Sequence, residues 1–164
     1  ISEWMGYFLL YESMLEAVLA AKARFLEPHG VLLPSHVELY VAPFTDVRMM
    51  AERRRFWSDI GGVDMSALLP EVMEEFAAEP RIEGLTYDQL LCEPILLWRY
   101  DFQQCCEPQH RNIQTKASWL CPARCVAHGY AGWFDCKFDL ATSSSSSPAF
   151  DSEATGSVLA DVVK

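Results

Sequence analysis

The chain has 164 residues, enough for one domain of ordinary size or for two small lobes with a sizeable hydrophobic core. Hydrophobic residues make up 51% of it and aromatic residues 12%, which excludes a wholly disordered chain. A formal net charge of −10 argues against nonspecific binding of nucleic acid and favours a cationic partner, such as a basic peptide. The longest apolar stretch, Trp4 to Tyr11, is 8 residues long and too short to cross a bilayer.

The cysteines bear on the cellular compartment and on metal binding. No basic segment is followed by an apolar run and a cleavage site, so we expect the six cysteines to be reduced thiols of an intracellular protein, cytoplasmic or nuclear. Cys121 and Cys125, with Cys105, Cys106 and His128 nearby, would suggest zinc, but their spacing lacks a second matched pair of ligands. We therefore predict no metal site and expect free thiols buried on strands.

The first part of the chain predicts a helix followed by a strand. Between residues 7 and 25 apolar residues recur mostly at three- and four-residue steps, the period of an amphipathic helix: Phe8, Tyr11, Leu15, Val18, Leu19 and Phe25. Residues 31–44 are predicted to be extended, with a break at Pro34 and a strand-like alternation at Val37, Leu39 and Val41. A helix followed by such a strand is typical of an α/β layer.

The middle of the chain predicts two further helices. The first runs from Asp46, which can cap it, to Trp57. Residues 61–94 then hold eight acidic residues against the single base Arg81: Asp64, Glu71, Glu74, Glu75, Glu79, Glu83, Asp88 and Glu93. Within this segment Met65 to Ala78 keep a helical period, so we predict a helical excursion between two lobes.

After Pro94 the pattern is that of β structure. Residues 95–103, 113–120 and 125–140 are strand-like runs separated by polar or proline-containing turns, which favours a barrel or a sandwich. The serine-rich stretch 143–147, with Pro148 and Gly156, is expected to be a mobile loop.

Two carboxylates near the start of the chain suggest a binding site for a cation. Glu3 is predicted to lie in a loop and Glu12 in the helix that follows, and Gly6 between them permits a sharp reversal. If the loop folds back, both carboxylates can face one pocket, where a planar guanidinium would neutralise them and donate paired hydrogen bonds. The alternative is a solvated carboxylate at a helix start beside an unrelated loop acid.

The same segment resembles a known motif. Residues 2–14 comprise Ser-Glu-Trp-Met-Gly-Tyr, three apolar residues and Tyr-Glu-Ser-Met, which resembles the double-Glu loop of the protein arginine methyltransferases, in particular the asymmetric-dimethylating type I branch. The resemblance covers roughly residues 1–140. It continues through Leu33-Pro34, Leu39-Tyr40-Val41, Phe56-Trp57, Val63-Asp64-Met65-Ser66 and residues 129–138.

The resemblance implies transfer of methyl groups from S-adenosylmethionine to ω-nitrogens of peptidyl arginine. It implies that Glu3 and Glu12 are the catalytic pair that clamps the guanidinium, and that Met14 lies beside the cofactor. Trp4, Met5 and Tyr7 would contribute to the substrate channel. Two carboxylates suit this reaction, because a sulfonium and a guanidinium are both cations and repel each other by roughly several kcal/mol at reacting distance.

The implied fold class is α/β plus β. Residues 1–44 would form the end of a Rossmann-like methyltransferase lobe, 45–60 a connecting helix, 61–94 a helical dimerisation arm, and 95–164 part of a β-barrel substrate lobe. The family's glycine-rich cofactor motif precedes the double-Glu loop and its Thr-His-Trp loop comes late. We therefore expect this sequence to be an internal fragment that is inactive alone.

The arm is expected to mediate homodimerisation through an apolar stripe, made of Leu68, Leu69, Val72, Met73 and Phe76, that docks on the cofactor lobe of a second subunit. The alternative is a helix packed on its own barrel. We expect arginine-rich protein substrates of the histone or Arg-Gly-Gly kind, no direct nucleic-acid partner and no membrane. A non-catalytic dimerisation or peptide-binding module is the alternative function.

Overall fold

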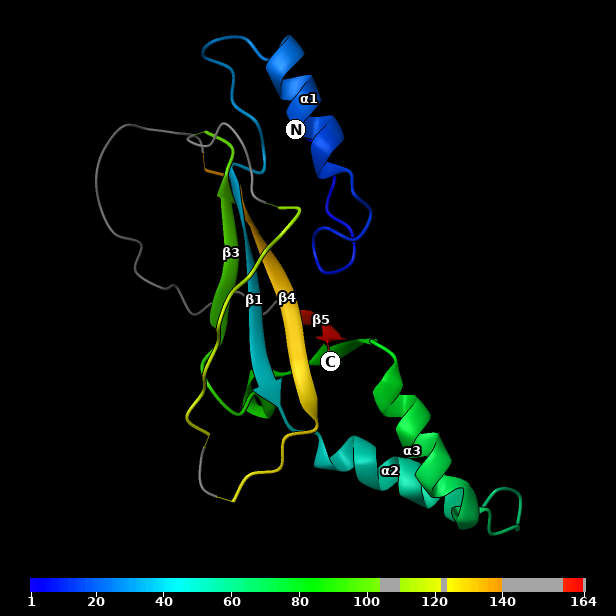
Figure 1. Cartoon of the computed structure of the whole chain (residues 1–164). Coiled ribbons are helices and arrows are strands. Elements are labelled where there is room, and N and C mark those ends of the chain that lie inside the picture. Colours follow the sequence, from blue (N-terminus) through cyan, green and yellow to red (C-terminus); the bar gives the residue numbers. More distant parts are fainter. Residues whose placement is uncertain (104–109, 122–123, 140–157, 164) are drawn as a thin grey trace.

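A computed structural model describes residues 1–103, 110–121, 124–139 and 158–163 of the chain, the last range in its backbone alone. Its elements follow the order α1 (Leu15–Phe25), β1 (His36–Phe44), α2 (Val47–Ser58), η1 (Ser66–Leu68), α3 (Leu69–Ala78), β2 (Ile82–Leu85), η2 (Tyr87–Gln89), β3 (Ile95–Asp101), β4 (Gly129–Lys137) and β5 (Val158–Val163). Figure 1 shows α1 at one end of a long sheet and the pair α2 and α3 projecting from the other end.

The strands form one antiparallel sheet in the order β2-β5-β4-β1-β3. β1 lies between β3 and β4, and its nine residues pair in unbroken register with β4, from His36 opposite Lys137 to Phe44 opposite Gly129. A bulge between Leu39 and Tyr40 shifts the register with β3. β1 and β4 therefore form the centre of the sheet, next to which the N-terminal segment packs.

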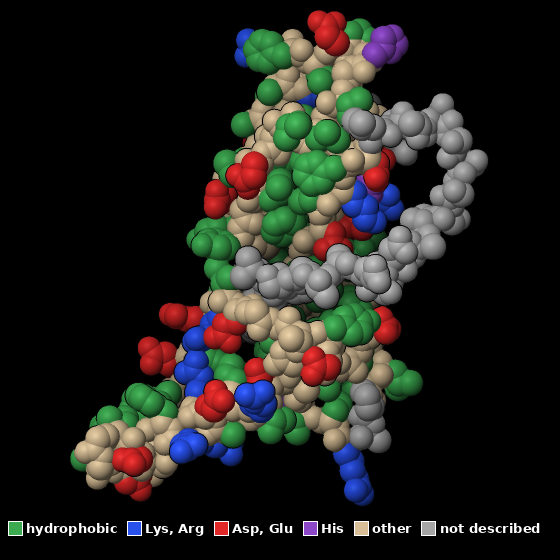
Figure 2. Space-filling model, turned by 180° about the vertical axis from the view of Figure 1, so that it is seen from behind, with side chains coloured by type: hydrophobic (Ala, Val, Ile, Leu, Met, Phe, Trp, Pro, Cys, Tyr) green, Lys and Arg blue, Asp and Glu red, His purple; other side chains and the backbone are tan. Residues whose placement is uncertain are grey.

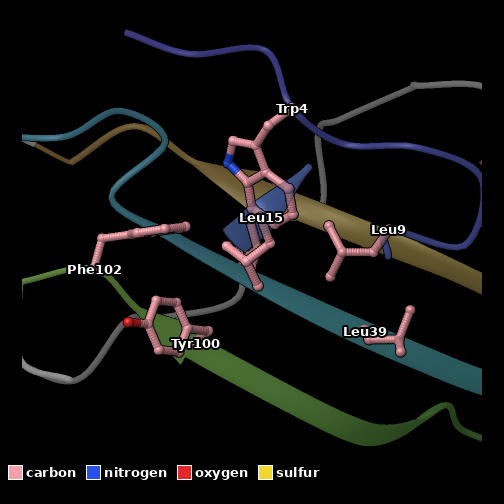
Figure 3. Packing of buried hydrophobic residues seen from close by; sticks show 7 residues of the cluster. Trp4, Leu9, Leu15, Leu39, Tyr100 and Phe102 are labelled. Atoms are coloured by element: carbon pink, nitrogen blue, oxygen red, sulfur yellow. The ribbon is translucent and has the colours of Figure 1, made fainter. Parts of the chain in front are cut away.

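The main hydrophobic core lies between one face of this sheet and the N-terminal segment (Figure 3). Its buried members are Trp4, Leu9, Leu15, Val37, Leu39, Tyr100 and Phe102. Alternate residues of β1 point into this core because successive side chains of a strand face opposite sides of the sheet. The core thus joins the carboxylate-bearing loop directly to β1 and β3.

The opposite face of β1 carries a charged network instead. Glu38 is only 4% exposed. It accepts a hydrogen bond of 2.8 Å from the Tyr40 hydroxyl and pairs with Lys137 at 3.1 Å and with Arg99 at 3.4 Å. Burial alone would raise the pKa of Glu38, but the hydrogen bonds from Tyr40 and Lys137 outweigh it and lower that pKa. The ionised carboxylate is therefore the stable form in the sheet.

Four predicted elements form close to their expected bounds. α2 begins after Asp46, whose carboxylate accepts a hydrogen bond of 2.9 Å from the backbone N–H of Met49, so the predicted cap is confirmed. β1 forms after Pro34, and β3 covers most of the predicted run 95–103. The predicted helix 65–78 forms as the short turn η1 followed by α3.

Other predictions need correction. The helix expected over residues 7–25 begins only at Leu15, since the preceding residues form tight turns. Residues 113–120 are irregular rather than a strand. The strand in residues 31–44 was assigned with residues 1–44 to the end of a Rossmann-like lobe. In the structure this strand is β1, which pairs with β3 and β4 in the main sheet. Periodicity predicts a strand but not its partners, which come from distant parts of the chain.

The described sheet is open, with β2 and β3 at its two edges, so a closed barrel is not observed in these ranges. The described residues contain no helix that is both long enough and apolar enough to cross a membrane. The serine-rich loop predicted over 143–147 lies outside the described residues.

Candidate active-site loop

The segment that carries the two carboxylates is a tightly folded loop. The backbone N–H of Gly6 donates to the carbonyl of Leu9 at 3.1 Å and the N–H of Leu9 donates back to Gly6 at 3.0 Å, which confirms the predicted reversal. Phe8, Leu9 and Ser13 adopt positive φ angles of 47°, 68° and 58°. Non-glycine residues rarely adopt this conformation, and such strained positions cluster at functional sites.

Contacts with the core hold this loop in place. The backbone N–H of Ser2 donates to the carbonyl of Leu33 at 2.9 Å, and the buried side chains of Trp4 and Leu9 anchor the two arms of the reversal (Figure 3). The Phe8 ring lies directly over Gly132 of β4, where a methyl group on that glycine would come within 2.2 Å of the ring. The loop is thus held by a backbone hydrogen bond, by burial of two side chains in the core and by contact of Phe8 with β4.

The reversal brings Glu12 back against the beginning of the loop. A methyl group added to Gly6 would lie 2.7 Å from Cγ of Glu12 and 3.0 Å from its backbone nitrogen, so only glycine fits there without a shift. Glu3 and Glu12 are both exposed, and within the described ranges neither is paired with a cation. Their negative charge is therefore available to a ligand.

The carboxylate of Glu3 acts electrostatically on Cys136 of β4. Burial, the carboxylate of Asp135 and then that of Glu3 raise the pKa of the Cys136 thiol to about 11. Cys136 is consequently protonated at neutral pH, which makes it a packing residue and a poor nucleophile.

The other predicted site residues have different surroundings. Trp4 is 2% exposed and packs edge-to-face on Phe102 with ring centroids 5.8 Å apart, so in this structure its side chain supports the loop from within the core. Met5 and Met14 are half-buried against the same core. Tyr7 is 57% exposed, on the accessible side of the loop.

Tyr11 was missed in the sequence analysis as a candidate for the site. Its ring lies 6.4 Å from that of Tyr7, and both tyrosines are exposed; Tyr11 directly precedes Glu12, and Tyr7 directly follows Gly6, against which Glu12 lies. Its position directly before Glu12 was the available signal, but the predicted helix assigned Tyr11 to an apolar face. The two rings form an aromatic surface next to a carboxylate, an arrangement that suits a planar cation.

The loop fits part of a sulfonium cofactor's surroundings. Met14 is half-buried and lies two positions after Glu12, so it could provide an apolar wall without placing another positive charge near a cation. Among the described residues no group of three or more acidic, histidine or cysteine side chains could hold a metal ion.

The arm residues form a second candidate site. α2 and α3 lie side by side away from the sheet (Figure 1), and they project at the lower left of the molecule in Figure 2. Neither helix contains a buried residue. Leu68 is exposed, while four members of the predicted stripe are half-buried: Leu69, Val72, Met73 and Phe76. The Phe76 ring is covered by two guanidinium groups, that of Arg53 at 3.5 Å and that of Arg81 at 4.5 Å.

Comparison with known proteins agrees with these features. The family model described as the arginine methyltransferase oligomerization subdomain matches residues 35–155. The chain is 36% identical over 139 residues to a probable protein arginine N-methyltransferase 6.2 of Oryza sativa subsp. indica, covering 85% of this chain and 35% of the relative. It is 34% identical over 145 residues to protein arginine N-methyltransferase 6 of Xenopus laevis, covering 84% of this chain and 42% of the relative.

Solved structures show the same fold. The Trypanosoma brucei PRMT1 enzyme–prozyme heterotetrameric complex with AdoHcy matches with a TM-score of 0.58 and 25% identity, covering 98% of this chain and 45% of that one. Protein arginine methyltransferase 10 of Arabidopsis thaliana matches with a TM-score of 0.56 and 28% identity, covering 84% of this chain and 44% of that one.

The chain therefore spans less than half the length of these relatives. Because the family model covers most of its residues, the chain belongs to the protein arginine methyltransferase family and contains that family's oligomerization subdomain.

Proposed function

We propose that the protein of which this chain is part transfers methyl groups from S-adenosylmethionine to ω-nitrogens of peptidyl arginine, and that Glu3 and Glu12 hold the guanidinium. The observation that carries this proposal is the geometry of the loop, which reverses and brings Glu12 against Gly6. Both carboxylates are exposed, and within the described ranges neither is paired with a cation. The names of the relatives support the same reaction class.

For this reaction the two glutamates must neutralise positive charge and orient the guanidinium. The cofactor, when bound, supplies a methyl group on a positively charged sulfur, which repels an arginine side chain in the same site. Two carboxylates offset this repulsion and accept hydrogen bonds from the guanidinium in a planar, oriented manner. Tyr7 and Tyr11 offer ring surfaces beside the same position, and Met14 is the residue of this chain proposed to contact the cofactor.

The experiment is Glu12→Gln in the full-length protein, with Glu27→Gln as the matched control. Glu27 is an exposed glutamate just beyond α1, so the control makes the same substitution outside the loop. We expect Glu12→Gln to lower methyl transfer to an arginine-rich peptide by about 10²-fold or more, because it removes electrostatic stabilisation at the reacting group. Cofactor affinity, measured by calorimetry, should change little.

Unchanged turnover in Glu12→Gln would contradict the clamp. Mass spectrometry of the product peptide would decide whether asymmetric dimethylarginine is formed, which is the product that the resemblance to the type I branch implies. If the full-length protein bound arginine-rich peptides but transferred no methyl group, the alternative of a non-catalytic peptide-binding module would be favoured.

We propose further that the arm mediates a homodimer. The support is that α2 and α3 bury no residue fully although α3 carries an apolar stripe, and that the matching family model is described as an oligomerization subdomain. The five-stranded sheet is proposed to be part of a β-barrel completed by the rest of the protein, with residues 1–14 attached to a Rossmann-like lobe. We also propose an intracellular location, supported by the four free cysteines of the described residues.

A further inference from the structure

Two cysteines that are distant in sequence meet outside the active-site loop. The sulfur atoms of Cys92 and Cys121 are 3.4 Å apart, although 29 positions separate them in the chain. The Cys92 thiol also points at the carbonyl oxygen of Leu120, at 3.7 Å. The Cys121 thiol was expected to be buried on a strand, but it is exposed, Cys92 is half-buried, and both residues lie in irregular segments.

The backbone around Cys92 is held firmly. The residue lies between η2 and β3, where the arm returns to the sheet. Directly before it, the backbone N–H of Leu91 donates to the carbonyl of Pro43 at 2.9 Å, and Leu90 forms a bridge with Phe44 at the end of β1. Cys92 is thus a fixed point next to the edge strand β3.

Cys121 lies at the end of an irregular segment that crosses the same edge. The hydroxyl of Thr115 in this segment donates to the carbonyl of Leu97 in β3 at 2.9 Å. Leu120 is 98% exposed, so little packing restrains this end of the segment. Cys121 can therefore move toward Cys92 without disturbing the core.

We propose that Cys92 and Cys121 form a reversible disulfide when the protein meets a peroxide or a disulfide oxidant. Closing the bond requires the sulfur atoms to approach from 3.4 Å to about 2.05 Å. This link would tie residues 110–121 to the point where the arm rejoins the sheet. It is independent of the methyl-transfer chemistry, because neither cysteine lies in the loop of Glu3 and Glu12.

The reaction with hydrogen peroxide balances in two steps. One cysteine thiolate attacks a peroxide oxygen, the O–O bond breaks, and a sulfenic acid and hydroxide form. The second thiolate attacks the sulfenic sulfur, the S–S bond forms, and hydroxide leaves. With the two thiol protons, the hydroxide ions become two molecules of water, and the cysteine pair has lost two electrons to the peroxide.

The other thiols provide internal controls. Cys136 on β4 is half-buried with a pKa raised to about 11, chiefly by burial, so it should react slowly. Cys125 interacts with Cys121, and contact with Cys92 raises the pKa of the Cys121 thiol. The experiment must therefore distinguish a disulfide between Cys92 and Cys121 from a competing disulfide between Cys121 and Cys125.

Trypsin sites in the sequence make that separation possible. Cleavage at lysine and arginine places Cys92 in the peptide 82–99 and Cys121 in the peptide 117–124, each without a second cysteine. Cys125 and Cys136 share the peptide 125–137. We would oxidise the full-length protein with hydrogen peroxide, block the remaining thiols, digest it and identify linked peptides by mass spectrometry.

We expect the peptides 82–99 and 117–124 to be joined, with the loss of two hydrogen atoms, and to separate on treatment with a thiol reductant. Cleavage of the native protein after the exposed Lys116 should slow several-fold on oxidation. Cys92→Ser and Cys121→Ser should each abolish both effects, while Cys136→Ser should retain them. Since Cys121 is exposed, its substitution should leave the fold intact even if Cys92→Ser does not.

A link between the peptides 117–124 and 125–137 in place of the expected one would overturn the proposal. Oxidation of both cysteines to sulfinic acid without any linked peptide would overturn it as well.

Discussion

At the scale of single residues, the candidate site depends on backbone conformations that most side chains avoid. Phe8, Leu9 and Ser13 all have positive φ angles, each of which costs about 1 kcal/mol or more for an ordinary residue. Burial of Trp4 and Leu9 offsets this cost, because each removes a large apolar side chain from water. The core thus stabilises a strained loop that positions Glu12.

Gly6 provides the test of this arrangement. We expect Gly6→Ala in the full-length protein to lower methyl transfer by about 10²-fold, since its methyl group would lie 2.7 Å from Cγ of Glu12 and displace the carboxylate. Gly84→Ala is the matched control, because among the described atoms outside its chain neighbours none lies within 4 Å of its added methyl group. Turnover of both variants would be compared at saturating cofactor, and equal turnover would show that the position of Glu12 is not critical.

At the scale of elements, the arm is a helix pair without a core of its own. No residue of α2 or α3 is buried, and one contact between the two helices is the Arg53 guanidinium over the Phe76 ring, at 3.5 Å from its centroid. Phe76 is therefore engaged within the arm rather than free on its surface. The exposed member of the stripe is Leu68, at its beginning, and the half-buried Leu69 is its neighbour in the chain.

This assignment predicts how the dimer can be disrupted. Leu68→Glu combined with Leu69→Glu should convert the full-length protein to a monomer, because two charges would have to be buried in an apolar contact. Ala78→Glu introduces the same side chain on the side of α3 opposite Leu69, and it should leave the dimer intact. Light scattering would measure the molar mass of each variant, and a dimer in both would place the interface elsewhere.

At the scale of the whole molecule, the central sheet joins the loop, the arm and the later strands into one framework. β1 is paired along its full length with β4 and also carries the Glu38 network on the face away from the N-terminal loop. Arg99 on β3 and Lys137 on β4 both pair with Glu38, so this carboxylate links three neighbouring strands.

The network predicts a pH-dependent contribution to stability. Because the pKa of Glu38 is lowered in the folded state, its carboxylate stabilises the fold above its unfolded pKa of about 4.3, and this stabilisation is lost as pH falls through the lower folded value. Glu38→Gln should therefore reduce the free energy of unfolding by about 1–2 kcal/mol at pH 7, a modest value because Arg99 and Lys137 are partly exposed to solvent.

Urea unfolding at several pH values would measure this difference. The gap between the unmodified protein and Glu38→Gln should narrow as the pH falls below about 4, and it should be smallest below the lowered folded pKa of Glu38, where the carboxyl group is neutral in both states. Glu75→Gln, at an exposed position on α3, should show no such gap at any pH. A Glu38→Gln difference that stays constant with pH would exclude the ion pairs as its cause.

The local features of the chain could be predicted from the sequence alone. The residue pattern from Ser2 to Met14 identified the family, and Asp46 correctly marked the start of α2. The alternation at Val37, Leu39 and Val41 correctly indicated a strand with one face in the core. These features depend on neighbours in the chain, which is why periodicity and capping patterns are sufficient to find them.

The contacts between these features could be seen only in the folded structure. The apolar spacing of residues 7–14 was consistent with a helix, but the fit of Phe8 over Gly132 and the burial of Leu9 favour a strained loop. The pairing of β1 with β4 and the contact of Cys92 with Cys121 likewise join residues far apart in sequence. Such contacts depend on which surfaces the folded chain brings together, and no local period encodes them.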